Sequence, residues 1–449
     1  MSSLLDQTAL SKLAERLVEA ARRAGADAAD AVAVRSMSLG VGVREGAVDQ
    51  SERSESDDVG LRVFVGRRTA VVSTNDIAGD VAPLAERAVA MAKVAPEDKF
   101  AGLADASRLA RSQPELDLLD PDMPSVAVLE DRALRAEAAG LAVKGVSKSE
   151  GASASASIGG MVLVTSDGFH GAYLVSRQGF SMSAIAGEGT AMETDYDYSS
   201  ALHAADLESP EKVGRTAGER AVARLNPRKV DTTKVPIVYD KRVSSSLVGH
   251  LAGAINGSSI ARKTSFLKDK RGERLFRPGI RIIDDPLRQR GQRSRPFDAE
   301  GVAGARLALI DDGVLTSWLL DSATARELGL TTTGHAQRGV SSAPSPGATN
   351  LYLEAGTMSP DALMADIQNG FYITSLIGMG VNQVTGDYSR GASGFWIENG
   401  KPTYPVSEVT IAGNLVDMFA SLTPANDLEF RHAVDAPTVR VEGLTVAGR

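Results

Sequence analysis

Residues 235–267 read V-P-I-V-Y-D-K-R-V-S-S-S-L-V-G-H-L-A-G-A-I-N-G-S-S-I-A-R-K-T-S-F-L, and the interpretation of the whole chain starts from them. The first six residues, 235–240, are typical of a short strand. The residues that follow, up to Ala254, are predicted to form a helix because their apolar side chains fall on one stripe. Three serines, residues 244–246, are expected to cap the start of this helix, and Asn-Gly-Ser-Ser at 256–259 indicates a turn. His250 lies among small residues, so the helix either carries a metal ligand or keeps the place of a missing one. The apolar stripe consists of Val243, Leu247, Leu251 and Ala254.

The composition indicates a soluble globular protein of more than one domain. A length of 449 residues suggests two or three domains, and 43% hydrophobic with 24% charged residues is ordinary for a globular chain. The formal charge of -8 argues against a main surface for nucleic acid. Only 5% of the residues are aromatic while 44 are glycine, so many short strands and turns are expected.

The sequence also limits the compartment and the metal chemistry. No apolar run approaches the roughly 18 residues of a membrane-spanning helix, and the first residues, M-S-S-L-L-D-Q, lack the basic start and apolar core of a signal peptide. A cytoplasmic location is therefore expected. The chain has no cysteine, which excludes disulfides, thiolate chemistry and the softest zinc ligand.

The first half of the chain predicts layers of helix and antiparallel sheet. Helices are expected at 7–24, 80–95, 125–141 and 209–225. Strands with alternating apolar residues are expected between the first and second helix and between the third and fourth. The polar run 51–58 is interpreted as an edge strand, and 96–124 as an irregular connecting arm. The order helix, strands, helix occurs twice before residue 226 without a residue-level repeat. We therefore predict one N-terminal α+β domain, 1–228, with two helix–sheet layers.

The second half, 229–449, predicts a β-rich domain. Glycine is dense within its strands, which indicates bends, bulges or close backbone approach and therefore a curved or barrel-like sheet. A helix is expected at 359–369, and a mobile loop, interpreted equally as a lid or a plain surface loop, at 331–348. The expected strands are 306–310, 314–320, 350–354, 371–376, 394–398 and 409–412.

The histidines give few options for a metal or catalytic site. No two of them stand at the spacing of helical metal ligands, and zinc catalysis usually needs three protein ligands. A packed or hydrogen-bonded role is favoured for His250. Ser245 and His250 lie about 140° apart around an ideal helix, so a serine nucleophile is disfavoured, and no nucleophile elbow surrounds the serines. The five histidines are His170, His203, His250, His335 and His432.

Three other segments of the chain are candidates for binding a ligand. His335 lies in the loop 331–348. The run 387–391, Asp-Tyr-Ser-Arg-Gly, either contacts a ligand or forms a hairpin, and the hairpin is favoured. The arginine run at 288–295 predicts a solvated face or a subunit contact rather than a phosphate site. The candidate substrate-binding residues are His335, Asn382, Tyr388 and Arg390.

Several stretches of the C-terminal half resemble the TldD/PmbA family of peptidases, and within it the PmbA (TldE) branch. The matching stretches are S-S-L-V-G-H-L-A-G-A-I-N-G-S-S-I-A-R-K-T-S-F-L, T-N-L-Y-L-E-A-G, and G-F-Y-I-T-S-L-I-G-M-G-V-N-Q-V-T-G-D-Y-S-R-G-A-S-G-F-W-I-E-N-G. The N-terminal half agrees in layout and more loosely in sequence. The resemblance implies a cytoplasmic peptidase assembled from two related subunits.

The resemblance also implies that the catalytic groups are missing from this chain. The TldD-type subunit carries H-E-x-x-x-H, in which two histidines hold zinc and the glutamate is the general base, together with a C-terminal cysteine ligand. Aligned on Gly249-His250, Ser245 replaces the first histidine and Ser246 replaces the glutamate, while the cysteine is absent. A hydroxyl is a poor zinc ligand at neutral pH and no substitute for a carboxylate base.

The expected function is therefore that of a non-catalytic subunit. It would pair with a TldD-type subunit, which would hold the zinc, or with itself, and help to enclose unfolded peptides; no metal or cofactor is expected in this chain. The alternatives are a homodimeric binding protein with no role in proteolysis, and an autonomous hydrolase that uses Ser245 or Ser246. The family is linked by name to modulation of DNA gyrase, but this acidic sequence suggests neither direct DNA contact nor membrane contact.

Overall fold

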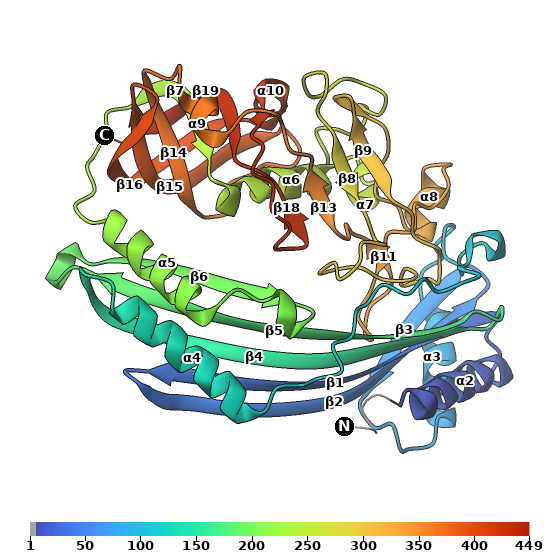
Figure 1. Cartoon of the computed structure of the whole chain (residues 1–449). Coiled ribbons are helices and arrows are strands. Elements are labelled where there is room, and N and C mark those ends of the chain that lie inside the picture. Colours follow the sequence, from blue (N-terminus) through green and yellow to red (C-terminus); the bar gives the residue numbers. More distant parts are fainter. Residues whose placement is uncertain (1–5, 449) are drawn as a thin grey trace.

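The structure is a computed structural model that describes residues 6–448. Its first half is built on one six-stranded antiparallel sheet in the order β3-β2-β1-β4-β5-β6 (Figure 1). The central pair β1–β4 runs from Asp30 opposite Thr165 to Val43 opposite Ala152. The strands are β1 (Ala28–Arg44), β2 (Ala47–Val65), β3 (Arg68–Thr74), β4 (Val146–Thr165), β5 (His170–Ala186) and β6 (Glu193–Ala201).

Four helices cover one face of this sheet. Ala29, Ala31 and Ala33 of β1 pack under the first two helices, and Leu39, Val41 and Val43 of the same strand pack under the last two. All six positions are odd-numbered, and alternate residues of a strand face the same side. The opposite face, with Val32 and Leu163, packs against Phe297 of the C-terminal half. The helices are α2 (Thr8–Arg23), α3 (Ala82–Val94), α4 (Val126–Leu141) and α5 (Pro210–Ala223).

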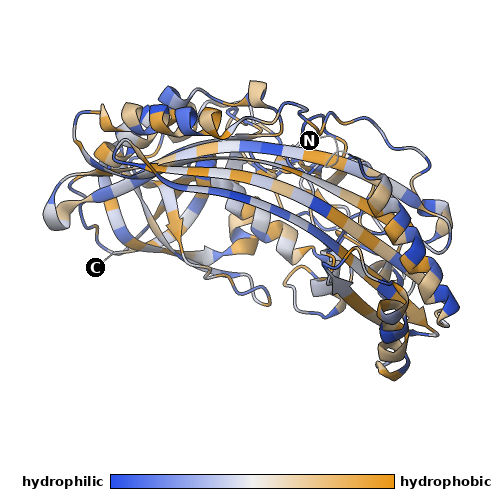
Figure 2. Ribbon diagram, turned by 90° about the horizontal axis from the view of Figure 1, so that it is seen from below, coloured by the Kyte–Doolittle hydropathy of each residue, from blue (hydrophilic) through white to orange (hydrophobic). Residues whose placement is uncertain are grey.

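The two predicted helix–strand layers form one continuous sheet. The order helix, three strands, helix occurs twice, and the two units join through β1 and β4. Figure 2 shows apolar and polar residues alternating along the long strands, as expected where each face has its own neighbours. The strands are much longer than predicted, because polar residues inside them remain in the hydrogen-bonded ladder.

The polar run 51–58 is an edge strand, as predicted. In the part of the chain that the structure describes, residues 47–58 of β2 pair with β1 alone, whereas residues 59–65 also pair with β3. Residues 47–56 are exposed. Charged and polar side chains along such an open edge discourage pairing with other chains.

The second half contains a closed five-stranded barrel, which confirms the α+β class with a barrel-like C-terminal region. Its strand order is β16-β15-β14-β7-β19, and pairing of β16 with β19 closes the ring. Gly394 is needed inside it, because a Cβ there would lie 1.9 Å from the carbonyl oxygen of Tyr372. The barrel strands are β7 (Thr233–Tyr239), β14 (Asn369–Ile377), β15 (Asp387–Glu398), β16 (Lys401–Asn414) and β19 (Val439–Ala447), with α10 (Leu415–Ser421) and β17 (Thr423–Pro424) beside them.

A second, irregular sheet lies next to the barrel, in the order β10-β9-β8-β13-β18. The helix predicted at 359–369 is wrong beyond Met364, because the chain turns and residue 369 already begins β14. The strand predicted at 314–320 is only two residues long. The elements are α7 (Gly257–Ala261), β8 (Ile282–Asp284), β9 (Leu307–Asp311), β10 (Val314–Leu315), α8 (Ser322–Glu327), β11 (Ala336–Gln337), β12 (Ser345–Pro346), β13 (Leu351–Leu353), α9 (Pro360–Met364) and β18 (Val434–Asp435).

The loop 331–348 is docked rather than free. Its strands β11 and β12 pair, the side chain of Arg338 is fully buried against Asp30, and the carbonyl of Val340 lies so close to Gly60 that any Cβ there would clash. The arginine run likewise makes contacts within the chain: Arg290 pairs with Asp117 and with Asp206. Arg290 is nevertheless exposed, in agreement with the solvated face predicted for that run.

Candidate functional site

Helix α6 (Lys241–Ala254) follows strand β7 directly. Its N-cap is Asp240, whose carboxylate accepts a hydrogen bond from the backbone N–H of Arg242 at 2.8 Å. The prediction that Ser244, Ser245 and Ser246 cap the helix is therefore wrong. The helix begins one turn earlier, because a carboxylate at the strand end is an equally good cap.

The predicted turn at 256–259 is also different. The side chain of Asn256 accepts a hydrogen bond from the N–H of Ser258 at 3.0 Å and caps α7. Its amide donates to the carbonyl of Pro346 at 2.7 Å, which ties α7 to the docked loop. Turn chemistry and cap chemistry use the same residues, so sequence alone did not separate them.

A cleft of about 620 Å³ opens between α6 and the sheet of the first half. The helix contributes Ser245, Ser246 and Gly249, the barrel contributes the end of β14 and Arg390 of β15, and β6 forms the opposite wall. The cleft is thus built from segments far apart in sequence. Its lining residues are Glu150, Ser183, Thr194, Asp195, Tyr196, Arg224, Arg242, Val243, Ser245, Ser246, Gly249, Thr374, Ser375, Leu376, Arg390 and Val434.

Two serines of α6, Ser244 and Ser246, use their hydroxyls to bind backbone carbonyls. The Ser246 hydroxyl donates to the backbone carbonyl of Val243 at 2.6 Å, and the buried Ser244 hydroxyl donates to the carbonyl of Ala436 at 3.3 Å. Neither bond involves an imidazole. A general base would have to lie within hydrogen-bond reach of the hydroxyl that it activates.

His250 is held as a neutral imidazole. Its ring packs edge-on against Tyr388 with centroids 5.9 Å apart. Burial, and then the positive charge of Arg390, lower the pKa of His250 to about 4. Its Nε2 atom is buried and has no hydrogen-bond partner among the described residues. The side chain is therefore a packed histidine beneath the cleft, uncharged at neutral pH.

The other histidines lie elsewhere. His203 binds the backbone carbonyl of Asp117 at 3.0 Å, His432 contacts the hydroxyl of Tyr198 at 2.9 Å, and His170 is exposed. Within residues 6–448, no group of three or more histidine, aspartate or glutamate side chains could hold a metal ion.

Of the candidate binding residues, Arg390 lines the cleft and Tyr388 lies beneath it. Tyr388 is buried, with its hydroxyl 3.5 Å from that of Tyr239. Asn382 is exposed and turns the chain: its backbone N–H donates to the carbonyl of Asp387 at 2.9 Å, and its side chain accepts from Val384. Residues 387–391 lie in strand β15 and pair with β16, as in the favoured hairpin interpretation, and Arg390 lines the cleft as well.

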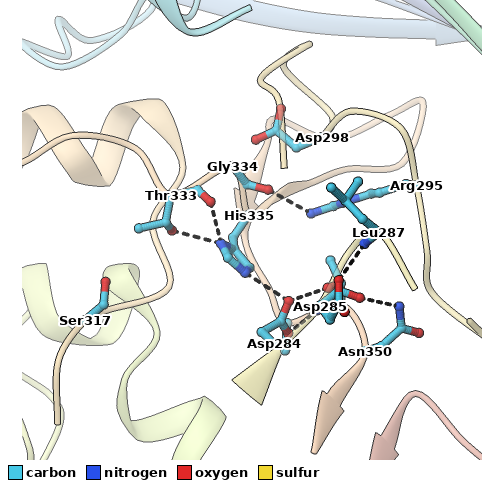
Figure 3. A network of polar contacts seen from close by, with 12 residues as sticks. Asp284, Asp285, Leu287, Arg295, Asp298, Ser317, Thr333, Gly334, His335 and Asn350 are labelled. Atoms are coloured by element: carbon cyan, nitrogen blue, oxygen red, sulfur yellow. Dashed lines mark hydrogen bonds and ion pairs between the residues drawn. The ribbon is translucent and has the colours of Figure 1, made fainter. Parts of the chain in front are cut away.

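His335 lies outside the cleft lining, in a buried polar network (Figure 3). Its Nε2 is 3.1 Å from a carboxylate oxygen of Asp284, and its Nδ1 is 2.9 Å from the carbonyl of Thr333. The same carboxylate accepts the N–H of Thr349 at 2.7 Å, and Arg295 donates to the carbonyl of Gly334. Both His335 and Asp284 are fully buried, so this network fixes the docked loop.

Strand β6 borders the cleft with its outer edge already occupied. Side chains of the second half donate to alternate carbonyls: Arg242 to Tyr196 at 3.2 Å, Arg431 to Tyr198 at 2.7 Å, and Gln292 to Ser200 at 2.9 Å. Carbonyls two apart point to the same side of a strand. These three donors therefore take the place of a neighbouring strand.

Strand β14 has an edge that stays open. Its parallel pairing with β7 ends at Ile373 opposite Tyr239, where the chain turns into α6. Among residues 6–448 no strand pairs with Thr374–Ile377 on that side, while β15 pairs on the other. Thr374, Ser375 and Leu376 line the cleft. An extended chain could add to this edge by main-chain hydrogen bonds.

Sequence reasoning missed the charged wall from the first half. Arg242 binds Asp195 at 2.8 Å, and Arg224 lies 3.4 Å from the other oxygen of the same carboxylate. The alternation E-T-D-Y-D-Y-S-S at 193–200 places Asp195 and Asp197 on one buried face. Two aspartates on the same face of this strand could have indicated, from sequence alone, that arginines of other elements pair with it.

Sequence profiles of one family match most of the chain. Residues 29–92 match the PmbA/TldA metallopeptidase domain 1, 119–225 the central domain and 232–448 the C-terminal domain. The metalloprotease PmbA of Escherichia coli O157:H7 is 37% identical over 426 residues, covering 94% of this chain and 93% of that protein. The PmbA homolog of Haemophilus influenzae is 36% identical over 435 residues, covering 96% and 94%.

Solved structures share the whole architecture. A Bacteroides thetaiotaomicron protein described as a modulator of DNA gyrase superposes with a TM-score of 0.90 at 28% identity, covering 98% of both chains. TldE of Thermococcus kodakarensis superposes with a TM-score of 0.85 at 18% identity, covering 97% and 100%, which shows the fold alone. No helix within residues 6–448 combines the length and the hydropathy needed to cross a membrane.

Proposed function

We propose, from the premise that the chain belongs to the PmbA/TldA metallopeptidase family, that it is the non-catalytic subunit of a peptidase complex. The zinc and the general base would be supplied by a TldD-type subunit. This chain would help to form the chamber that receives unfolded peptides. The complex would act in the cytoplasm, without direct contact with nucleic acid.

The observation that carries the proposal is the chemistry of α6 where it faces the cleft. The three positions that would bind zinc or act as base hold Ser245, Ser246 and His250. The Ser246 hydroxyl is engaged with its own helix, and His250 is packed against Tyr388. These observations support the proposal that α6 has kept its place in the fold without the reactive groups.

The residues at this place do not fit a zinc ion. Protein zinc sites use thiolate, imidazole or carboxylate ligands, usually four with water included. One imidazole and two hydroxyls fall short of that set, and no step of peptide hydrolysis is assigned to them. A serine-type hydrolase is not favoured either, because no imidazole bonds the hydroxyl of Ser246.

What the chain can contribute is a shaped wall and, at the cleft, a strand edge that no strand of residues 6–448 pairs with. The outer edge of β6 is occupied by Arg242, Arg431 and Gln292, whereas β14 stays open at Thr374–Ile377. Main-chain pairing is tolerant of side-chain sequence. A strand edge of this kind suits varied, unfolded peptides.

The direct test is reconstitution. The purified chain is assayed for hydrolysis of an unfolded protein substrate alone and mixed with a TldD-type relative bearing the histidine-rich motif, each with metal analysis. We expect no activity and no stoichiometric zinc for the chain alone, and zinc-dependent hydrolysis with the partner. A variant with Ser245→Ala and Ser246→Ala should support the partner equally well.

The contradicting outcomes are specific. Metal-dependent proteolysis by the isolated chain would place catalysis here and overturn the proposal. Loss of hydrolysis in the serine double variant would indicate the serine-type alternative. A chain that forms only homodimers, binds peptides and never alters the partner's activity would be a binding protein outside proteolysis.

A further inference from the structure

We propose that Arg390 is a carboxylate-binding residue, which engages an acidic group of an extended peptide lying along β14. The inference rests on the proposed function in that it takes peptides as the ligands of the cleft. It goes further by assigning this chain a preference among them. The acidic group is either the C-terminal carboxylate of the peptide or an aspartate or glutamate side chain.

The first step is the charge balance of the cleft. Its lining contains three arginines, Arg224, Arg242 and Arg390, against two carboxylates, Glu150 and Asp195. Arg224 and Arg242 are both paired with Asp195. Among the ion pairs formed within residues 6–448, none within 4.0 Å involves Arg390. Arg224 has a second partner in Glu193, so Arg390 is the arginine of the lining without a carboxylate in contact, and Glu150 lies in the same lining without an ion pair to another described residue.

The second step is the cost of keeping that cation partly buried. Arg390 is half-buried, and its Nε–H is buried with no hydrogen-bond partner among the described residues. Next to it lies His250, which cannot offset the charge because an imidazole is either neutral or positive. A guanidinium left in this state gains free energy when a carboxylate arrives, and its fork of N–H donors fits two carboxylate oxygens at once.

The third step is the position of Arg390 relative to the open edge. In the ladder between β14 and β15, Leu376 lies opposite Ala392 and Ile377 lies opposite Gly391. Arg390, the preceding residue of β15, therefore lies one ladder position beyond Ile377, on the other side of β14 from the open edge, and it lines the same cleft as Thr374, Ser375 and Leu376. A peptide paired along β14 would bring one of its ends, or a side chain near that end, to this guanidinium.

The test is direct binding to the full chain without a partner. A polar decapeptide with an uncharged BODIPY label is titrated in three forms and followed by anisotropy: free C-terminal acid, C-terminal amide, and amide with one internal glutamate. At least one acidic form should bind about tenfold more tightly than the plain amide, as expected for a charge-assisted hydrogen bond. The two acidic forms separate the terminal carboxylate from the side chain.

Variants assign the effect to the residue. Arg390→Gln should bind all three peptides as weakly as the wild type binds the amide, Arg390→Lys should keep part of the preference, and Arg262→Gln, an exposed arginine outside the cleft lining, should behave as wild type. Equal affinity of the three peptides for the wild type, no binding of any, or a preference retained in folded Arg390→Gln would overturn the inference. Activation of a TldD-type partner without carboxylate preference would overturn it and leave the subunit role intact.

Discussion

At the scale of single residues, His250 is a packed histidine whose surroundings disfavour its charged form. An imidazole that binds metal or moves protons needs a free lone pair and a partner that orients the ring. Here the ring packs edge-on against Tyr388, and Arg390 adds a positive charge nearby. Burial, and then the charge of Arg390, disfavour the imidazolium by lowering the pKa of His250, so the residue contributes shape rather than proton chemistry.

We predict that His250 stays neutral down to about pH 5. The folded-state pKa of about 4 lies below the ordinary value of 6.5, so between these values the unfolded chain binds more protons and the stabilising effect disappears as pH falls. Relative to His250→Gln, the wild type should lose ~1–2 kcal/mol of unfolding free energy from pH 6.5 to pH 4, allowing for its partial exposure. Urea unfolding at several pH values measures this, and an imidazole NMR titration with a midpoint at or above 6.5 would contradict it.

Sequence placed His250 on the correct helix, but it did not reveal what surrounds this side chain. Tyr388 and Arg390 belong to β15, far along the chain, and only the closed barrel brings them to α6. The start of α6 was misplaced for a local reason. Asp240 and the serines are all good N-caps, and the hydrogen bond that selects Asp240 is a matter of geometry.

At the scale of elements, the sequence predicted the positions of the helices but not how the helices pack against each other. Helical periodicity gave all four helices of the first half to within a few residues, because each has one apolar face. The contact between α4 and α5 depends on glycine instead. A Cβ at Gly214 would lie 1.9 Å from the carbonyl oxygen of Ala136, so the helices touch through their backbones. The strands were underestimated for the opposite reason: paired polar residues such as Arg35 and Asp57, joined at 2.6 Å, continue the ladder without an apolar pattern.

We predict that Gly214→Ala destabilises the protein by about 2–4 kcal/mol, because the helices must separate to make room for the methyl group and leave poorly packed space. Gly249→Ala is the matched control on another helix. A Cβ at Gly249 meets no atom within 4 Å, so this change should be neutral or stabilise by ~0.5–1 kcal/mol through helix propensity. Equilibrium urea unfolding of both variants measures the difference. Equal stabilities would show that α4 and α5 do not pack as described.

At the scale of the whole molecule, the two halves meet through buried charge. Asp30 and Arg62 come from the sheet of the first half, and Glu300 and Arg338 come from the second; Arg62 donates to Asp30 at 2.8 Å, and Arg338 pairs with the same carboxylate. Sequence could not predict this contact, because each half alone would leave these side chains in water. Once assembled, charges buried together stabilise the joint only while they remain balanced.

The buried charges between the two halves make the stability of this contact depend on pH, and Glu300 is the group that titrates. Its carboxylate accepts the N–H of Ser322 at 2.8 Å and lies 3.9 Å from Arg62. Burial and then the neighbouring charge of Asp298 raise the pKa of Glu300 from an ordinary value of 4.5 to about 7, against the opposing effect of Arg62. The remaining charged groups of the joint are Asp30, Arg295, Asp321 and Arg338. The joint therefore holds a proton that the unfolded chain releases.

We predict that Glu300→Gln removes a pH-dependent part of the stability. Between pH 4.5 and about 7 the folded protein binds the extra proton, so the stabilising effect of the wild-type residue is complete below 4.5 and is lost as the pH rises through 7. The amide keeps an acceptor for Ser322 and never ionises. Relative to the variant, the wild type should lose ~1–3 kcal/mol between pH 4.5 and pH 8 and then level off. Urea unfolding across this range, with the exposed Glu52→Gln as control, measures the effect; parallel curves for Glu300→Gln and wild type would mean that Glu300 is already ionised in the joint.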